Sequence, residues 1–214
     1  MADHRLPLAK LIGLVWLHGV AFYLLYVYLT TYLVTVTPIP LGAVLTLNTG
    51  CMTLLAILIP VAGRFSDMVG QKPLLLGGAG GLTIFSYPLF LWLTSTDLLS
   101  MVAAQVLLTV LVSCYMGPFF AATADLFPTR QRYTGLSLGY NIASALFGGT
   151  APLVATLLIE WSGNTHAPSF YLSFCAAVSF AVASTLSSGL QPAAPSAPTS
   201  CHDDDRERRG LRPG

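Results

Sequence analysis

The amino-acid sequence predicts an all-α membrane protein, a single bundle of six transmembrane helices. Of the 214 residues, 54% are hydrophobic and only 9% are charged, whereas about 25% of the residues of an ordinary soluble domain carry a charge. The charged residues also cluster, so that long stretches contain none. About 20 apolar residues are enough for a helix to cross a bilayer, and these stretches are long enough.

The uncharged stretches divide into six predicted spans. The longest stretch must hold two of them, because Pro38, Pro40 and Gly42 form a turn signal in its middle, and a proline disfavours the helical conformation of the residue before it. The predicted spans are residues 8–36, 41–63, 73–93, 97–126, 133–160 and 168–189.

The C-terminal end differs in composition from the spans. Proline, alanine and serine residues are followed by a run of charged residues from Asp203 to Arg209. Segments of this kind bury too little apolar surface to fold. We therefore predict a six-helix transmembrane bundle in residues 1–190 and a disordered cytoplasmic tail in residues 191–214.

The placement of charge predicts the orientation in the membrane. All ten basic residues fall on one side of the predicted spans, and the opposite loops carry only Asp97, Glu160 and His166. Positively charged loops stay in the cytoplasm. We therefore expect a multi-pass protein of the cell (inner) membrane with both termini in the cytoplasm.

Several function classes find no support in the sequence. The net charge of +1 gives no electrostatic case for nucleic acid. Three of the four cysteines lie inside predicted spans, and no spacing indicates a metal site. A phosphate-binding G-x-x-x-x-G-K-(S/T) loop is absent from the sequence, which argues against ATP-driven transport within this chain. We expect no cofactor.

The loop between the second and third predicted spans carries a first motif. Asp67 precedes a predicted helix, whose positive dipole end favours a carboxylate, and nearby basic residues could pair with it across the cytoplasmic face. The loop resembles the signature of the major facilitator superfamily, G-x-x-x-D-(R/K)-x-G-(R/K)-(R/K). Gly63, Asp67, Gly70 and Lys72 match it, whereas Met68 and Gln71 stand where basic residues are expected. The resemblance implies a breakable latch, and the alternative is that the basic residues only hold the loop in the cytoplasm.

A second motif lies between the fourth and fifth predicted spans. Asp125 is followed by Leu-Phe-Pro-Thr and then by Arg130, Gln131 and Arg132 before Tyr-Thr-Gly. This segment is similar to the metabolite:proton symporter branch of the superfamily, in which a carboxylate and the same run lie between the tenth and eleventh helices. Asp125, Arg130 and Arg132 are therefore expected to join the cytoplasmic latch.

The resemblance covers the last six helices of a twelve-helix transporter. It implies two inverted three-helix repeats and a substrate pathway between this bundle and a partner bundle. The partner would be an N-terminal six-helix half or, less well, a second copy of this chain. In the family the first and fourth helices of each bundle line the pathway.

Polar residues recur at helical spacing on those two spans and on their neighbours. We favour the pathway for the first and fourth spans, and packing for the second and fifth, because serine, threonine and asparagine often bond across helices or to their own backbone. The pathway candidates are His18, Tyr23, Tyr26, Thr30, Asn48, Gln105, Thr109, Ser113 and Asn141.

The predicted function is one half of a secondary active transporter, which carries a small organic solute with protons by alternating access. The solute would be a carboxylate or a zwitterion, such as a dicarboxylate, citrate, proline or betaine. His18 is the one ionisable residue well inside a span, so the main proton-coupling carboxylates are expected in the partner half.

Two alternatives are a truncated remnant or membrane assembly subunit that does not transport, and an intramembrane serine protease built on the G-x-S-x-G pattern around Ser137.

Overall fold

The computed structural model describes residues 5–95, 97–126 and 132–186, with the backbone alone for residues 5, 6 and 132–134. It confirms the prediction of an all-α chain with six helices long and apolar enough to cross a membrane. The first span consists of α1 (Arg5–Phe22), a π-helical segment η1 (Tyr23–Tyr28) and α2 (Leu29–Val36). The others are α3 (Leu41–Val69), α4 (Gln71–Leu93), α5 (Leu98–Ala124), a fifth span of α6 (Arg132–Ala143), η2 (Ser144–Gly148) and α7 (Gly149–Ser162), and α8 (Ala167–Ser184).

The connection between α3 and α4 is much shorter than the predicted loop of residues 63–73. The helix α3 continues to Val69, and α4 begins at Gln71. Gly70 alone joins them, with a φ of 104° that a residue with a side chain rarely adopts. Its backbone N–H donates to the carbonyl of Ser66 at 2.8 Å. The loop prediction was wrong because polar residues sustain a helix after it leaves the apolar region.

The packing of the spans follows a two-fold pattern. The first span packs against the fifth span and α8, whereas α5 packs against α3 and α4, and α4 packs against α8. Spans one, two and three correspond to spans four, five and six in this pattern. The contacts of the first span with the fifth and sixth spans thus match the contacts of the fourth span with the second and third. Each repeat contains an odd number of helices, so the two repeats run in opposite directions, as the predicted inverted repeats require.

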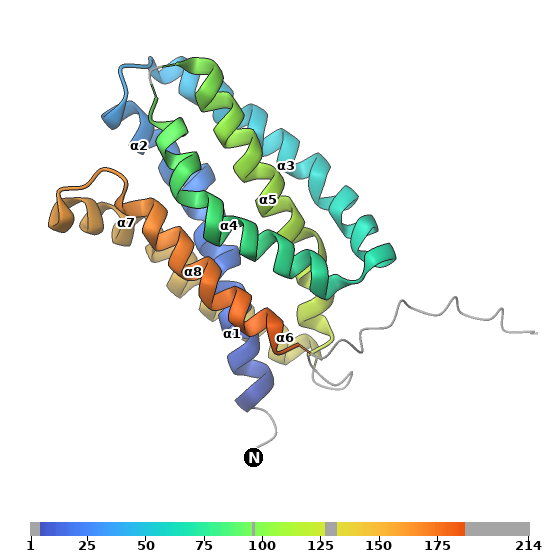
Figure 1. Cartoon of the computed structure of the whole chain (residues 1–214). Coiled ribbons are helices and arrows are strands. Elements are labelled where there is room, and N and C mark those ends of the chain that lie inside the picture. Colours follow the sequence, from blue (N-terminus) through green and yellow to red (C-terminus); the bar gives the residue numbers. More distant parts are fainter. Residues whose placement is uncertain (1–4, 96, 127–131, 187–214) are drawn as a thin grey trace, which may run out of the picture.

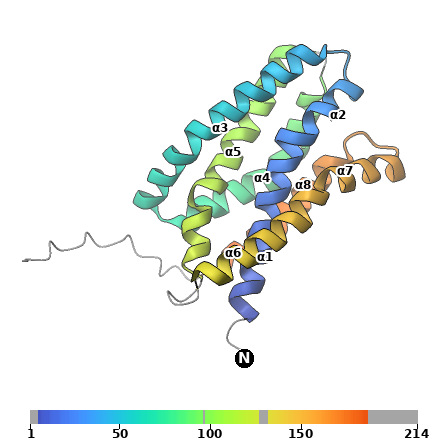
Figure 2. The same ribbon diagram turned by 180° about the vertical axis from the view of Figure 1, so that it is seen from behind.

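The arrangement leaves the second and fifth spans at opposite edges. Figures 1 and 2 show α3 at one edge, α6 and α7 at the other, and the first span running between them. Burial agrees with this picture, because the first span is the most buried of the six and α3 and the fifth span are the least buried. The first span is therefore the central element of the bundle.

A close helix crossing joins the first and fifth spans at Gly19 and Gly148. A Cβ atom added to Gly19 would lie 3.1 Å from Cα of Gly148, and one added to Gly148 would lie 2.8 Å from the ring of Tyr23. Trp16, one turn away, stacks on Phe147 with ring centroids 4.6 Å apart. Lipid gives helices no hydrophobic drive to associate, so small residues that permit close packing stabilise such contacts.

Two lysines at the basic end of the bundle bind the C-terminal end of α8. Nζ of Lys10 donates to the carbonyl of Thr185 at 3.1 Å, and Nζ of Lys72 donates to the carbonyl of Leu186 at 2.6 Å. The last carbonyls of a helix have no partner in the helix itself, and its C-terminus carries partial negative charge. The two lysines therefore tie α1 and α4 to α8.

The predicted orientation can be tested with single cysteines in a chain freed of its native cysteines. A membrane-impermeant thiol reagent added from outside should label positions 97 and 165 and should miss positions 68 and 131. Thr165 and Met68 are both exposed at opposite ends of the bundle, so burial would not explain a difference between them. Labelling of position 68 from outside would contradict the orientation.

Candidate functional site

Polar side chains of the first span point in two directions, and the direction changes within the π-helical segment η1. Tyr23 begins η1 and faces the fifth span, whereas Tyr26 lies within η1 and faces α5. A π turn holds an extra residue, and such segments are frequent at functional sites. The predicted face of Tyr23, Tyr26 and Thr30 is therefore divided.

One direction leads to a closed group of four residues, the inner polar cluster. The Tyr26 hydroxyl donates to Oγ1 of Thr109 at 3.1 Å, and Nδ2 of Asn48 donates to the carbonyl of Tyr26 at 2.9 Å. Nε2 of Gln105 donates to Oδ1 of Asn48 at 3.3 Å. The cluster therefore joins η1, α3 and α5 across three helices.

The inner polar cluster lies inside this bundle and not on a surface that a second bundle could cover. Gln105, Thr109 and Ser113 are 2%, 1% and 2% exposed. The first span and α3 cover this face of α5. Ser113 stands apart from the cluster and donates to the carbonyl of Val110 at 2.7 Å. These contacts favour the packing interpretation for α5.

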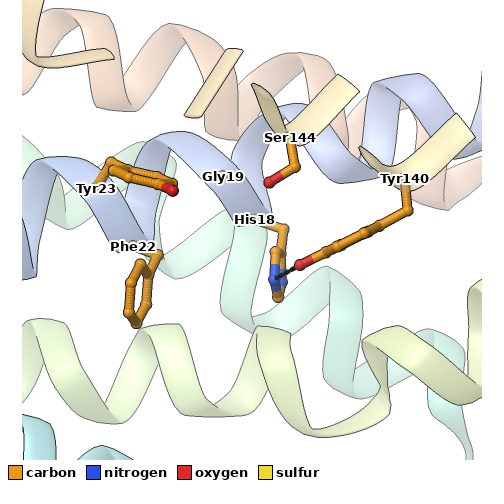
Figure 3. A pocket seen from close by; sticks show the side chains of 6 residues that line it. All are labelled: His18, Gly19, Phe22, Tyr23, Tyr140 and Ser144. Atoms are coloured by element: carbon orange, nitrogen blue, oxygen red, sulfur yellow. Dashed lines mark hydrogen bonds between the residues drawn. The ribbon is translucent and has the colours of Figure 1, made fainter. Parts of the chain in front are cut away.

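The other direction leads to an open cavity, the His18 cavity. Its volume is about 210 Å³, and it lies between the first and fifth spans beside the glycine crossing. Figure 3 shows its lining from both spans, namely His18, Gly19, Phe22, Tyr23, Tyr140 and Ser144. Small-molecule sites typically combine apolar walls with a few placed polar groups, and this cavity has that composition.

His18 is held in a fixed orientation. Its Nε2 shares a hydrogen bond of 3.2 Å with the Tyr140 hydroxyl, which donates when Nε2 carries no proton. The imidazole stacks on Phe119 with ring centroids 4.2 Å apart, and it meets the Phe120 ring in a T-shaped arrangement with centroids 5.6 Å apart. The other ring nitrogen, Nδ1, is buried and has no hydrogen-bond partner within the described chain.

The depth of His18 gives this arrangement chemical significance. It lies about 12 Å along the helix from Lys10, at 1.5 Å per residue. Ionisable side chains at membrane depth are costly and mark ion or proton pathways. The other described ionisable residues among Asp, Glu, Lys, Arg and His lie near span ends. In the tautomer whose Nε2–H donates to the Tyr140 hydroxyl, Nδ1 carries no hydrogen and can accept a proton.

Two predicted pathway residues lie outside both groups. Thr30 is half-buried and forms no hydrogen bond with the described residues. Asn141 is exposed and donates to the carbonyl of Ser137 in its own helix at 2.8 Å. Tyr140 and Ser144, which were interpreted as packing residues, line the cavity instead. Their spacing of four placed them on one face, but the sequence could not show which helix that face meets.

The predicted latch residues separate in the structure. Asp67 is exposed in the last turn of α3, so the expectation that it precedes a helix N-terminus was wrong; Gly70 occupies that position. Lys72 binds the end of α8 and not Asp67. Gly63 faces the carbonyl oxygen of Gly117, 3.9 Å from an added Cβ, and thus allows close packing of α3 and α5.

The second motif joins α5 to α4. Oδ2 of Asp125 accepts from Nε2 of Gln71 at 3.4 Å. Gln71 is one of the two positions that depart from the basic residues of the signature, so an amide makes this contact. Arg130 and the side chain of Arg132 lie outside the described residues. The latch therefore remains a prediction.

The nucleophile pattern around Ser137 does not form the strand-to-helix turn that a serine hydrolase needs. Ser137 lies within α6 and is exposed, and His18 bonds Tyr140. The protease alternative has no support in this geometry.

The inner polar cluster predicts a measurable coupling between Tyr26 and Thr109. In a double-mutant cycle of Tyr26→Phe and Thr109→Val, unfolding in bicelles should give a coupling free energy of about 0.6 to 1.7 kcal/mol, the range for hydrogen bonds between membrane helices. A matched cycle of Tyr26→Phe with Thr83→Val should give none, because Thr83 bonds the carbonyl of Ala79 in its own helix. Equal coupling in both cycles would contradict the cluster.

Comparison with known proteins identifies the family. The family model described as Major Facilitator Superfamily matches residues 11–211. The chain is 35% identical over 167 residues to the "Putative proline/betaine transporter" of Staphylococcus aureus (strain COL), an alignment that covers 77% of this chain and 35% of that protein. It is 31% identical over 173 residues to the "Proline/betaine transporter" of Escherichia coli (strain K12), with 78% of this chain and 33% of that protein covered.

A third relative is the "Ectoine/proline transporter ProP" of Corynebacterium glutamicum, which is 28% identical over 175 residues, or 82% of this chain and 35% of that protein. The chain thus spans about a third of the length of the curated relatives that it matches. These relatives are transporters and not enzymes, which excludes the protease alternative. The chain belongs to the major facilitator superfamily of multi-pass membrane transporters, and its six helices form one half of that fold.

Proposed function

We propose that this chain is the C-terminal half of a proton-coupled symporter for a small zwitterion. The observation that carries the proposal is the His18 cavity, a polar hollow between the first and fifth spans at membrane depth. One bundle offers only one wall of a central pathway, and alternating access requires two bundles that move about a shared site. A second bundle would therefore complete the site.

The chemistry of the described chain favours a zwitterion over a dicarboxylate or citrate. An anion with several charges needs cationic partners, usually arginine or lysine. Both described lysines lie at the basic end and bind carbonyls of α8. The names of the relatives, which refer to proline, betaine and ectoine, point to the same solute class.

Proton coupling is part of the proposal, and His18 is its candidate in this half. An imidazole is the side chain whose charge ordinarily changes closest to neutral pH. When Nε2–H donates to the Tyr140 hydroxyl, the buried Nδ1 is left to take a proton. We assign the main coupling carboxylates to the partner bundle.

The cytoplasmic latch belongs to the proposal as well, with Asp67 as its member and without Lys72. Asp67 lies exposed at the basic end of α3 and has no hydrogen bond or ion pair with the described residues. A carboxylate in that place can pair with a basic residue of a second bundle when the cytoplasmic side closes. Lys72 instead keeps α8 in place.

A second candidate function is that of an assembly subunit that does not transport. The burial of Gln105, Thr109 and Ser113 inside the bundle supports it, because that face of α5 then lines no pathway. Reconstitution distinguishes the two functions.

The proposal predicts that uptake depends on a partner bundle. Liposomes that contain this chain together with the N-terminal six helices of the Staphylococcus aureus relative should take up labelled proline or betaine when the lumen is alkaline, and a protonophore should abolish uptake. The chain alone should show none. Failure of every pairing would favour the assembly subunit, and uptake by the demonstrably monomeric chain would contradict the half-transporter.

The latch predicts a specific kinetic defect for Asp67→Asn in the paired transporter. Loss of the charge should slow turnover and shift the balance between the two open states by about 1 to 3 kcal/mol, the usual size of coupling between sites. Expression should persist, because Asp67 is exposed and caps no helix. Asp67→Glu should restore most of the turnover. Unchanged turnover and conformational labelling in Asp67→Asn would remove Asp67 from the gate.

A further inference from the structure

A second cavity lies at the end of the bundle opposite the basic loops, between the outer part of the first span and α7. Its volume is about 290 Å³, which exceeds that of the His18 cavity. We call it the outer cavity. Its lining is Tyr28, Thr31, Tyr32, Thr35, Val36, Thr156, Ile159 and Glu160.

The lining carries one sign of charge only. Its polar groups are hydroxyls and the Glu160 carboxylate, with no basic side chain among them. The described basic side chains, Lys10, Arg64 and Lys72, lie near the opposite ends of their spans. Glu160 itself forms no hydrogen bond or ion pair with the described residues. Within the described part of the chain, the outer cavity therefore offers a carboxylate that no basic side chain pairs with.

Aromatic rings form part of the same wall. Tyr28 and Tyr32 lie one turn apart, with ring centroids separated by 6.1 Å and planes inclined by 32°. The Tyr32 hydroxyl donates to the carbonyl of Thr165 at 2.7 Å, and Oγ1 of Thr156 lies 3.5 Å from the Tyr28 hydroxyl. These bonds fix the first span against the loop after α7 and against α7 itself. A rigid ring beside a carboxylate is the chemistry that binds an organic ammonium ion.

Other ligands fit the outer cavity less well. A divalent metal ion needs several carboxylate or imidazole ligands, and no group of three His, Cys, Asp or Glu that could hold one occurs among the described residues. His166, the other titratable side chain near Tyr32, instead packs its ring 6.4 Å from that of Tyr87. Asp97 caps α5 and accepts from the Ser100 hydroxyl at 2.8 Å, which lowers the pKa of the Asp97 carboxyl. Neither contributes to the cavity wall.

We propose that the outer cavity binds the ammonium or quaternary ammonium group of a small solute through Glu160 and the Tyr28 ring. The role of this site in capturing a zwitterion before its transport rests on the proposed function. The binding itself does not, because it uses side chains of this chain alone. The site would stand at the expected extracellular end and raise the local concentration of solutes with a cationic group.

The proposal is tested on the full chain in nanodiscs of neutral lipid, with tetramethylammonium as the probe and calorimetry at pH 7 as the measurement. Binding should be saturable, and tert-butanol, a neutral molecule of similar shape, should not compete. Glu160→Gln should weaken binding by about two- to fivefold, the loss expected when an exposed carboxylate partner is removed and the ring remains. Tyr28→Leu should weaken it as well, and Tyr28→Phe should not, since the ring remains.

Asp97→Asn is the matched control, because it removes the same charge at the same end of the bundle and asparagine serves equally well as a helix N-cap. It should leave tetramethylammonium binding unchanged. Equal effects of Glu160→Gln and Asp97→Asn, equal binding of tert-butanol, or no saturable binding would each overturn the site. Intact binding with no uptake in the paired liposomes would refute the proposed function and leave the site standing.

Discussion

The contact of Gly19 with Gly148 is the constraint on which the rest of the site depends. A Cβ at either position would press on backbone or on the Tyr23 ring. In a bilayer the spans gain little from burying apolar surface against one another, so such close packing carries much of the association between the first and fifth spans. The crossing brings His18, which precedes Gly19, within hydrogen-bonding distance of Tyr140.

The π-helical segments on either side of the crossing explain why one helix serves two purposes. The segment η1 follows Gly19 by a turn, and η2 ends at Gly148. Within η1, Tyr26 takes part in the inner polar cluster that holds α3 and α5 in the bundle. On the near side, His18 and Tyr23 face the cavity. Packing and access to the pathway thus use different faces of the same span, and the outer cavity begins where η1 ends, at Tyr28.

Much of the fold could be predicted from the sequence, since the length of each apolar stretch and the Pro38 turn determine the number of spans. The site could be predicted only in part. His18, Tyr23 and the residues of the inner polar cluster were recognised because polar groups are rare in apolar helices. The residues that these side chains contact, such as Tyr140 for His18, were not recognised. A search for a period of 3.6 residues cannot predict a π turn, and sequence spacing shows which residues share a helix face without showing which helix that face contacts. Asp67 was misplaced for a related reason, since Gly70 alone makes the turn for which the sequence predicted a loop of eleven residues.

The central claim, that the glycine crossing positions the His18 cavity, is tested most directly by the side-chain nitrogen resonances of His18 in histidine-labelled chain. Gly148→Ala should shift them strongly, because the new Cβ displaces Tyr23 and separates the spans that hold the His18 and Tyr140 pair. Gly149→Ala, an identical change at a position with open space around it, should leave them as in the unmodified chain. Unshifted resonances in Gly148→Ala, or equal shifts in both variants, would contradict the claim.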